Sequence, residues 1–518
     1  MDLNINDALD RVIANPYASH CWIALRRAVG AEWTAQARDD VVQRLAEAVR
    51  QPGLPQFYKA MVLDVLTGDP QWLCEAAATL AVMQPQDADR MAVFFNAAWQ
   101  RSLLHAVNRT DFTARLGTLG LPRLASHIDA AVSAQPPAPQ PEPAPKDPAR
   151  PIRRVAVLAA QLLDPGHPPT RMALDMVEVL TALGYETHLF SANDAQAPDS
   201  EHLLGNGVTP TLVETELVGW LRTMPATTQV HSCNPAYSVR RRCHDVLAKL
   251  DEFNPDGLVF VGLYSPVVAL ARRRWPLLGM ATSSIAPMVW SDVWLTAQAH
   301  LHGQYASTWG GSQPPQLAFY YPFRRYGDPA RRAGRAGAGA GVGSRIRILT
   351  VGNVLTSRIG GEWAMRMVQL LLDYPQVHWH LLGGKGILPP VLASLPPERI
   401  QATPHVTDMT PHWNDCDVYI NPPGMGGGLA VAEAMDAGLP VVTFSNTDGG
   451  DKVGADAVDS LDEYFALCVA LVTDAPQRNM LGRRLAQRFD QDIDLARAAP
   501  HLRQAMELAV HRFHSRPD

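Results

Sequence analysis

The sequence predicts an α/β protein with two Rossmann-like domains, preceded by an all-α N-terminal domain. Apolar residues recur at helical spacing through the first 133 residues. Beyond them, short apolar runs typical of buried parallel strands alternate with amphipathic helices in two blocks, residues 152–333 and 345–518. A chain of 518 residues is also too long for one domain, and about two to four are expected.

The helical pattern of residues 1–133 indicates helical hairpins, with Pro16, Pro55 and Pro70 at the connections. Such domains usually bind or assemble, so we expect this one to be the place for any oligomer contact. Residues 134–151, AQPPAPQPEPAPKDPARP, are typical of an extended polyproline linker. We therefore expect the helical domain to fold independently of the rest.

The first α/β block opens at Arg154 with the strand RVAVLAA, the loop QLLDPGHPPTR and the helix MALDMVEVLTALG. Gly184 ends this helix, and the strand YETHLFS follows, which completes a βαβ unit. PDGLVFVG at 255–262 predicts a further strand. The glycine- and arginine-rich residues 330–345 are flexible by composition and indicate a connection to the second block.

The second block begins at Ile346 with the strand IRILTVG and continues with the helix WAMRMVQLLLDY and the strands VHWHLLGG and DVYI. The stretch 421–454, NPPGMGGGLAVAEAMDAGLPVVTFSNTDGGDKVG, then predicts a glycine loop, a helix closed by Gly438 and another strand. Glycines at a strand-to-helix turn allow positive φ and let a phosphate approach the backbone near the helix start. The candidates for this contact are Gly424, Gly426, Gly427 and Gly428.

Glu433 lies about a turn and a half into the helix after the glycine loop. A carboxylate there can accept hydrogen bonds from ribose hydroxyls, as acidic residues do in other nucleotide folds. The alternative is an ordinary glycine-rich turn in a βαβ unit.

The segment N-P-P-x-x-x-G-G-G-L-A-V-A-E-A-M-D-A-G-L-P-V-V-T resembles the donor site of GT-B glycosyltransferases, in families 4 and 41. The resemblance implies that Glu433 holds the nucleotide ribose and the glycine loop holds the diphosphate. It also implies that the last helix, near IDLARAAPHLRQAMELAVHRF, crosses back to the first Rossmann-like domain. Family 4 carries a second glutamate eight residues before the first, where this chain has Met425. That departure weakens the assignment of this chain to family 4 and, with it, the expectation of that family's retaining mechanism.

The loop after the first strand, Asp164–Arg171, resembles the G-N-H-P-T loop of the inverting O-GlcNAc transferase family, family 41, with one extra proline. The resemblance carries over to His167 and Thr170 on the acceptor side. An imidazole there could accept the acceptor's proton, since it titrates near neutral pH. The alternative is a polar turn.

Further donor contacts are expected in the loops that follow the strands of the second block. The resemblance implies that Arg358 holds the diphosphate, in the loop that also contains Gly352 and Asn353, and that His405 lies near the base. Lys385 follows a strand in GGKG, and Asp451 follows the VVTF strand, so both lie on the same rim. For Arg358 the alternative is a surface arginine, for His405 a helix cap or core residue, and for Asp451 a solvated turn.

Composition excludes several functions. The net charge of −6 does not indicate nucleic acid as the main partner. The six cysteines are scattered without a C-x-x-C pair, so neither a disulfide framework nor a zinc site is expected. The N-terminus lacks a signal-peptide core, and no run of about twenty apolar residues occurs. We expect a cytoplasmic protein.

The sequence therefore predicts a GT-B glycosyltransferase that moves a sugar from a nucleotide-diphosphate sugar such as a UDP-sugar. The resemblance implies no metal and no other cofactor, a protein or peptide acceptor, and inversion at the anomeric carbon. Two alternatives stay open: a nucleotide-sugar 2-epimerase, and a non-catalytic GT-B subunit that binds another glycosyltransferase.

Overall fold

A computed structural model describes most of the chain. The described residues are 5–28, 35–83, 88–134, 150–163, 167–194, 228–234, 236–285, 287–297, 315–319, 323–325, 345–352, 355–384, 386–406 and 408–516. Asn353, Lys385 and most of the proline-rich linker lie outside them. The domain boundaries given above therefore stay predictions.

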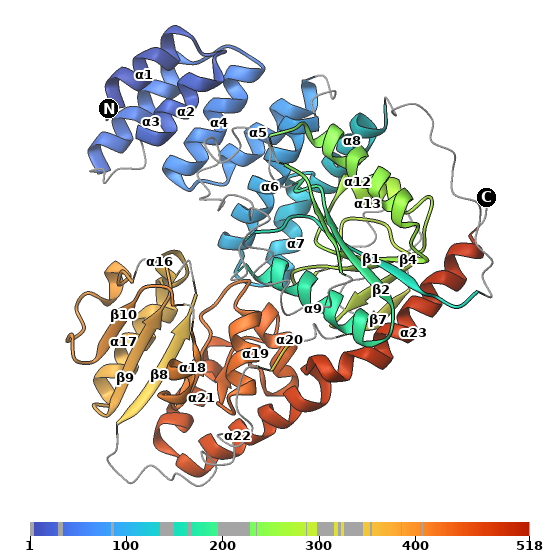
Figure 1. The fold of residues 1–518 in the computed structure, drawn as a ribbon. Coiled ribbons are helices and arrows are strands. Elements are labelled where there is room, and N and C mark those ends of the chain that lie inside the picture. Colours follow the sequence, from blue (N-terminus) through green and yellow to red (C-terminus); the bar gives the residue numbers. More distant parts are fainter. Residues whose placement is uncertain are drawn as a thin grey trace.

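The chain begins with a helical region, defined here as residues 5–134 (Figure 1). Its helices are α1 Ile5–Ala14, α2 Ser19–Ala28, α3 Ala35–Ala48, α4 Leu54–Thr67, α5 Gln71–Val82, α6 Ala88–His105, α7 Arg109–Thr118 and α8 Leu121–Ser133. Asn108 begins α7, because its side chain accepts a hydrogen bond from the backbone N–H of Asp111.

The first sheet has seven parallel strands in the order β3-β2-β1-β4-β5-β6-β7. Its elements are β1 Arg154–Ala159, α9 Pro168–Ala182, β2 Glu186–Ser191, β3 Val230–Ser232, α12 Val239–Phe253, β4 Gly257–Val261, α13 Pro266–Ala271, β5 Leu277–Met280, β6 Val293–Thr296 and β7 Gln316–Ala318. The strand order reverses between β1 and β4, and such folds bind ligands at the carboxyl ends of the strands there.

The second sheet has five parallel strands in the order β10-β9-β8-β11-β12. Its elements are β8 Ile346–Val351, α16 Leu355–Arg358, α17 Gly361–Asp373, β9 Val377–Leu382, β10 Ile400–Thr403, α18 Thr410–Asn414, β11 Val418–Ile420, α19 Gly428–Asp436, β12 Val441–Val442, α20 Asp448–Val453, α21 Leu461–Thr473, α22 Ala475–Arg488 and α23 Leu495–His514. Two parallel sheets and a helical N-terminal region confirm the predicted fold class.

The last helix, α23, returns from the second sheet to the first. It is the long red helix that runs across the lower right of Figure 1 and packs against β4, β5, β6 and α9. Beyond its end, the guanidinium of Arg516 pairs with Asp292, whose side chain is fully buried. The apolar cluster on this side is continuous from the first sheet through α23 to the second sheet.

The helical region shares its hydrophobic core with the first sheet. On β1, Val155 and Val157 belong to the cluster on the α9 and α23 side, whereas Ala156 and Leu158 belong to the cluster that contains the N-terminal helices. Phe95 of α6 also lies against Tyr264, which follows β4, with ring centroids 4.8 Å apart. Because each part covers apolar surface of the other, a shared core of this kind favours coupled folding, and the independently folding helical domain stays a prediction.

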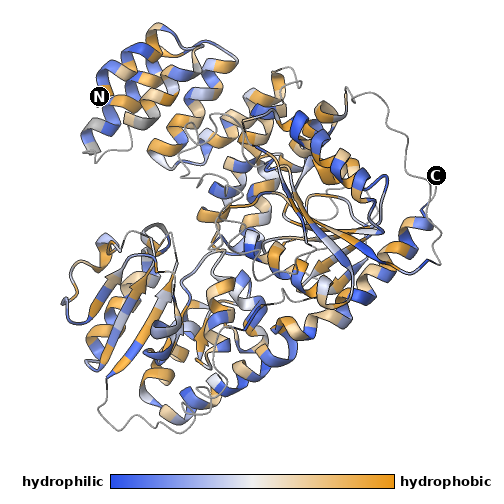
Figure 2. Cartoon of the chain, in the orientation of Figure 1, coloured by the Kyte–Doolittle hydropathy of each residue, from blue (hydrophilic) through white to orange (hydrophobic). Residues whose placement is uncertain are grey.

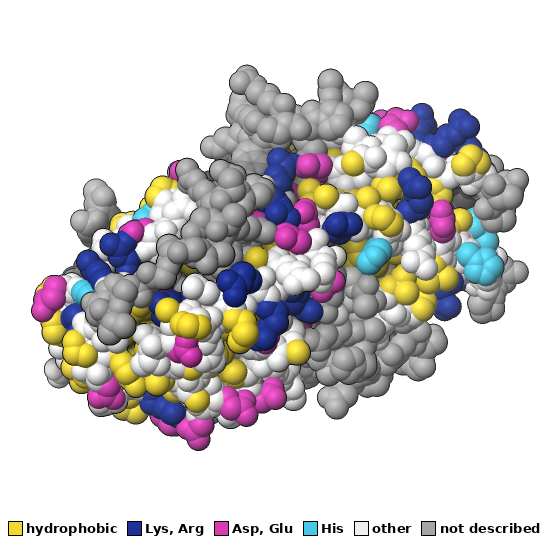
Figure 3. All heavy atoms as spheres, turned by 90° about the horizontal axis from the view of Figure 1, so that it is seen from below, with side chains coloured by type: hydrophobic (Ala, Val, Ile, Leu, Met, Phe, Trp, Pro, Cys, Tyr) yellow, Lys and Arg dark blue, Asp and Glu magenta, His cyan; other side chains and the backbone are white. Residues whose placement is uncertain are grey.

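Hydrophobic residues concentrate in the strands of both sheets and on the facing sides of their helices (Figure 2). On the face drawn in Figure 3, basic and acidic side chains are interspersed and no large field of one sign stands out. None of the helices in the described ranges is long and apolar enough to span a bilayer.

Candidate functional site

The centre of the candidate site is the glycine loop between β11 and α19. Gly424, Gly426 and Gly427 all have positive φ, at 103°, 92° and 81°. A Cβ on Gly427 would come within 2.3 Å of the Asn421 side-chain oxygen, so no larger residue fits without a shift. Gly428 then starts α19. The loop therefore has the glycine-dependent backbone that the sequence predicts at a strand-to-helix turn.

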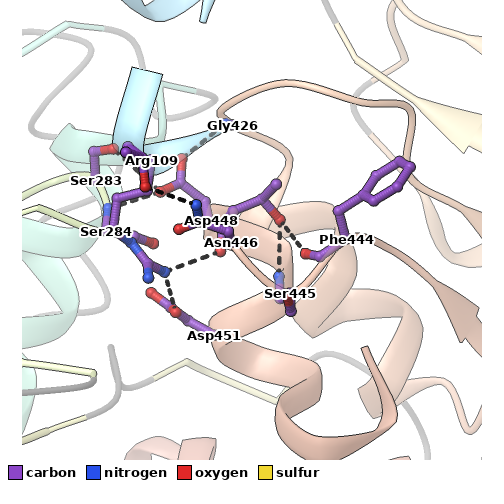
Figure 4. A network of polar contacts seen from close by, with 12 residues as sticks. Arg109, Ser283, Ser284, Gly426, Phe444, Ser445, Asn446, Asp448 and Asp451 are labelled. Atoms are coloured by element: carbon purple, nitrogen blue, oxygen red, sulfur yellow. Dashed lines mark hydrogen bonds and ion pairs between the residues drawn. The ribbon is translucent and has the colours of Figure 1, made fainter. Parts of the chain in front are cut away.

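A carboxylate joins the glycine loop to the first sheet. The backbone N–H of Gly426 donates to Asp448 Oδ2 at 2.8 Å. The other oxygen, Asp448 Oδ1, accepts from the backbone N–H of Ser284 at 2.7 Å and from the hydroxyl of Ser283 at 3.1 Å (Figure 4). Because Ser283 and Ser284 follow β5, Asp448 connects the strand ends of both sheets.

Glu433 reaches from α19 to the first α/β half. Its Oε1 lies 3.2 Å from Nη1 of Arg171, on the first turn of α9, and the two side chains are 17% and 12% exposed. Burial raises the pKa of Glu433, while Arg171 and a hydrogen bond from Trp413 lower it. A carboxylate has about four acceptor positions, so these partners leave capacity for ribose hydroxyls. The ribose contact stays a prediction.

His167 and Thr170 come together at the start of α9, as their shared loop requires. His167 is the residue before the helix, and its Nδ1 lies 3.0 Å from Thr170 Oγ1. Thr170 is fully buried and its hydroxyl accepts from the backbone N–H of Leu163 at 2.8 Å. Arg171 lies one turn beyond His167, on the same side of the helix. The first turn of α9 thus carries both the imidazole and the partner of Glu433.

Arg358 lies beneath the glycine loop. Its Nη2 donates to the carbonyl oxygens of Pro422 at 2.8 Å and Pro423 at 3.2 Å, and burial lowers its pKa. These bonds hold the Pro-Pro-Gly turn in place. The sequence did not predict them. A direct contact with a diphosphate stays a prediction.

The other expected donor residues have different surroundings. Gly352 follows β8, and its backbone N–H donates to Leu382 at 3.0 Å. His405 follows β10 and is exposed, with its backbone N–H bonded to Gly384. Asp451, on α20, is 1% exposed, and its carboxylate pairs with Arg109 of the helical region. Their contacts with a donor stay predictions.

Three residues of this network were missed by sequence reasoning: Arg109, Arg171 and Asp448. Arg171 ends the loop that resembles family 41, and Asp448 begins the DGGDK turn, so both stand beside recognised motifs. Arg109 has no local signal. Met425 also gains an explanation, because it is 3% exposed and belongs to the apolar cluster of the N-terminal helices. An ionised glutamate would be costly there.

A pocket with about 600 Å³ of empty space, part of it open to solvent, lies at the carboxyl ends of β1, β4 and β5. Helix α6 forms its other wall with Phe95 and Trp99, and Pro169 of α9 also lines it. Gln161 Oε1 and the indole N–H of Trp99 are buried and have no hydrogen-bond partner in the described part of the chain. The pocket is thus mostly apolar, and its polar lining includes Asn96 and Asp194 besides this acceptor and this donor.

No group of three or more His, Cys, Asp and Glu side chains with metal-binding geometry occurs among the described residues. The expectation that the chain needs no metal stays a prediction.

The comparisons with known proteins agree with this architecture. Residues 345–473 match the family of glycosyl transferases group 1. No curated protein matches the sequence. Among solved structures, a mutant of the O-GlcNAc transferase of Thermobaculum terrenum is 16% identical, with a TM-score of 0.50, over 99% of this chain and 100% of that one. A glycosyltransferase from Rickettsia africae is 10% identical, with a TM-score of 0.48, over 69% of this chain and 98% of that one.

The likeness at a TM-score of 0.50 covers the helical region as well as both sheets, and at 16% identity it shows the fold alone. The family match covers most of the second sheet's part of the chain, with the glycine loop, Glu433 and Asp448. The chain is a glycosyltransferase of the GT-B fold, with a domain of glycosyl transferases group 1 at residues 345–473.

Proposed function

We propose that this protein transfers a sugar from a nucleotide-diphosphate sugar, such as a UDP-sugar, to a protein or peptide, without a metal ion and with inversion at the anomeric carbon. The observation that carries the proposal is the Glu433–Arg171 contact. It brings the donor segment, with its glycine loop, against the turn of α9 that holds His167.

The leaving group is a nucleoside diphosphate. Backbone N–H groups at the start of α19 and the positive end of its dipole stabilise the charge that develops on it, since the Gly426 N–H is already bonded to Asp448. Glu433 accepts hydrogen bonds from the ribose and so fixes the nucleotide relative to this loop. Arg358 keeps the loop in shape through the Pro422 and Pro423 carbonyls.

Inversion follows from direct displacement. The acceptor oxygen or nitrogen forms a bond to the anomeric carbon, and the bond to the diphosphate oxygen breaks with its electron pair going to the diphosphate. His167 takes the proton of the nucleophile. The Thr170 hydroxyl, 3.0 Å from His167 Nδ1, orients the imidazole. The buried Met425 supports this mechanism, since it stands where the retaining family 4 has an acid.

The pocket between α6 and the first sheet supports the acceptor class. It offers aromatic and aliphatic surface with a free carbonyl oxygen on Gln161 and a free N–H on Trp99. A neutral group with both a donor and an acceptor, such as a peptide or side-chain amide or a hydroxyl, satisfies both atoms. The charged residue of this lining is Asp194, so an anionic acceptor would lack a counter-ion here.

A panel of nucleotide sugars tests the proposal. We expect one of them to bind, to be hydrolysed slowly, and to glycosylate a peptide library, with a product whose anomeric proton shows the opposite configuration to the donor by NMR. A retained configuration would contradict inversion, and efficient transfer to lipid or sugar with no transfer to peptides would contradict the acceptor class. Sugar interconversion without transfer would indicate the 2-epimerase. No donor binding at all would indicate a non-catalytic subunit.

A further inference from the structure

The turn between α6 and α7, residues 106–110, contacts two loops of the second sheet's half. The Met425 N–H donates to the Ala106 carbonyl at 3.3 Å, which places this turn against the glycine loop. The Arg109 N–H donates to the Asn446 carbonyl at 2.9 Å, and the Asn446 side chain donates to the Thr110 hydroxyl at 3.0 Å. The helical region therefore touches the donor segment directly.

The strongest of these contacts is a buried ion pair. The Arg109 guanidinium, from the first residue of α7, pairs with Asp451 on α20 and also reaches the Thr447 carbonyl (Figure 4). Arg109 is 4% exposed and Asp451 is 1% exposed. Burial raises the pKa of Asp451, and Arg109 is the leading partner that lowers it. Without Arg109, a buried carboxylate on α20 would lose its main counter-ion.

Helix α20 carries the effect to the glycine loop. Asp448 is its first residue, and it holds the Gly426 N–H on one oxygen and the Ser284 N–H on the other. Because α20 has only six residues, a shift at Asp451 moves Asp448 as well. Arg109 is therefore linked to the glycine loop in three steps: the ion pair to Asp451, the backbone of α20 from Asp451 to Asp448, and the hydrogen bond from Gly426 to Asp448.

The Arg109–Asp451 ion pair has incomplete hydrogen bonding. Nε and Nη1 of Arg109 are buried and have no hydrogen-bond partner within the described ranges. Unsatisfied donors of this kind are destabilising, and a buried ion pair with incomplete hydrogen bonding is weak evidence for a stabilising role. A positional role gives a reason to keep it.

We propose that Arg109 is a positioning residue of the donor site, through which the helical region sets the geometry of the glycine loop. The inference rests on the proposed function, since it assumes that this loop binds a nucleoside diphosphate. The helical region then contributes to the geometry of the donor site, and it also forms one wall of the proposed acceptor pocket.

Calorimetric titration of the full chain tests this, with UDP as the probe, or with GDP or TDP if the unchanged protein binds one of these more tightly. We expect Arg109→Gln to weaken nucleotide binding at least tenfold. Arg109→Lys keeps the charge and should restore affinity to within about fivefold of the unchanged protein. The matched control is Arg101→Gln, which breaks the Arg101–Asp64 pair inside the helical region. It should lower the unfolding temperature and leave the dissociation constant within twofold.

Two results would overturn the inference: a folded Arg109→Gln variant that binds within twofold of the unchanged protein, or an equal loss in Arg101→Gln. If Arg109→Gln does not fold, Thr110→Val removes only the exposed hydroxyl that accepts from Asn446. It should weaken binding about two- to fivefold, as expected for one hydrogen bond, and unchanged affinity would count against the inference. If the unchanged protein binds none of the three nucleotides, the proposed function fails and this inference falls with it.

Discussion

Glu433 is the residue that we propose to hold the ribose in the donor site. Its carboxylate links the two α/β halves, since it is bonded to Arg171 at 3.2 Å, and its side chain is only 17% exposed. Burial alone would favour the neutral acid, and the positive charge of Arg171 opposes that effect. The pair therefore favours a carboxylate that can accept hydrogen bonds, although it is largely shielded from water.

Replacing Glu433 should weaken nucleotide binding. In Glu433→Gln the side chain keeps its size but loses the charge that strengthens hydrogen bonds to the ribose, so we expect a loss of about 1.5–3 kcal/mol. Calorimetry with the cognate nucleoside diphosphate measures it. Glu362→Gln, an exposed glutamate on α17, is the control. Unchanged affinity in a folded variant would remove Glu433 from the site.

His167 should affect the rate of transfer more than binding of the donor. It directly precedes α9, on the side that we propose faces the acceptor, and its ring is bonded to the buried Thr170. Loss of a general base typically lowers the rate by about 10²–10⁴-fold. We therefore expect His167→Ala to reduce kcat by that range and to leave the nucleotide dissociation constant within about threefold. A normal rate in this variant would assign proton removal to another group or to water.

At the scale of elements, the contact between α8 and the loop after β4 contains a carboxyl group whose pKa is raised to near neutral pH. The Tyr264 hydroxyl lies 2.7 Å from Asp129 Oδ1 and 3.0 Å from the Ala125 carbonyl oxygen. Burial raises the pKa of Asp129 from 3.8 to about 7, against smaller lowering effects of Tyr264, Arg272 and Arg273. The contact between α8 and Tyr264 is therefore most stable when the Asp129 carboxyl is protonated.

The consequence for stability has a definite sign. Between pH 4 and 7 the folded state holds the Asp129 proton more tightly than the unfolded state, so this group's contribution to stability falls as pH rises and levels off above about 7. Asp129→Asn cannot ionise. We expect it to raise the thermal midpoint by about 1–4 °C relative to the unchanged protein at pH 8 and by less at pH 4.5. The same difference at both pH values would show that Asp129 does not titrate in this range.

At the scale of the whole molecule, the helical region and the first sheet depend on each other. Ala156, Leu158 and Phe260 of the sheet share one apolar cluster with Phe94, Leu121 and other residues of the helices. Truncation would expose this surface to water, and the free-energy cost of that exposure is about 25 cal/mol per Å² of apolar area.

A protein consisting of residues 152–518 should therefore fold poorly. We expect low solubility or strong binding of a hydrophobic dye compared with the full chain, because the apolar surface of α12 and α13 against which α6 and α8 pack is left open. Solubility trials and dye fluorescence with the full chain as control measure this. A soluble fragment with a cooperative unfolding transition would restore the independent helical domain that the sequence predicts.

Sequence alone could predict the local parts of the molecule. Apolar runs, glycine positions and helix periodicity depend on neighbouring residues, so the fold class and the β11–loop–α19 segment could be predicted from the sequence. The alternation of β1 side chains between two cores follows from strand geometry. Strand geometry does not predict which elements cover each face of the sheet.

Only the tertiary structure decided the contacts between distant segments. Arg109 and Asp451 are 342 positions apart, and Arg171 and Glu433 are 262 apart. No periodicity or motif encodes such pairs, because they arise when helices and loops already formed locally are packed together by burial of apolar surface. For the same reason the sequence predicted a separate helical domain, whereas packing joins its core to the first sheet and brings its 106–110 turn to the glycine loop.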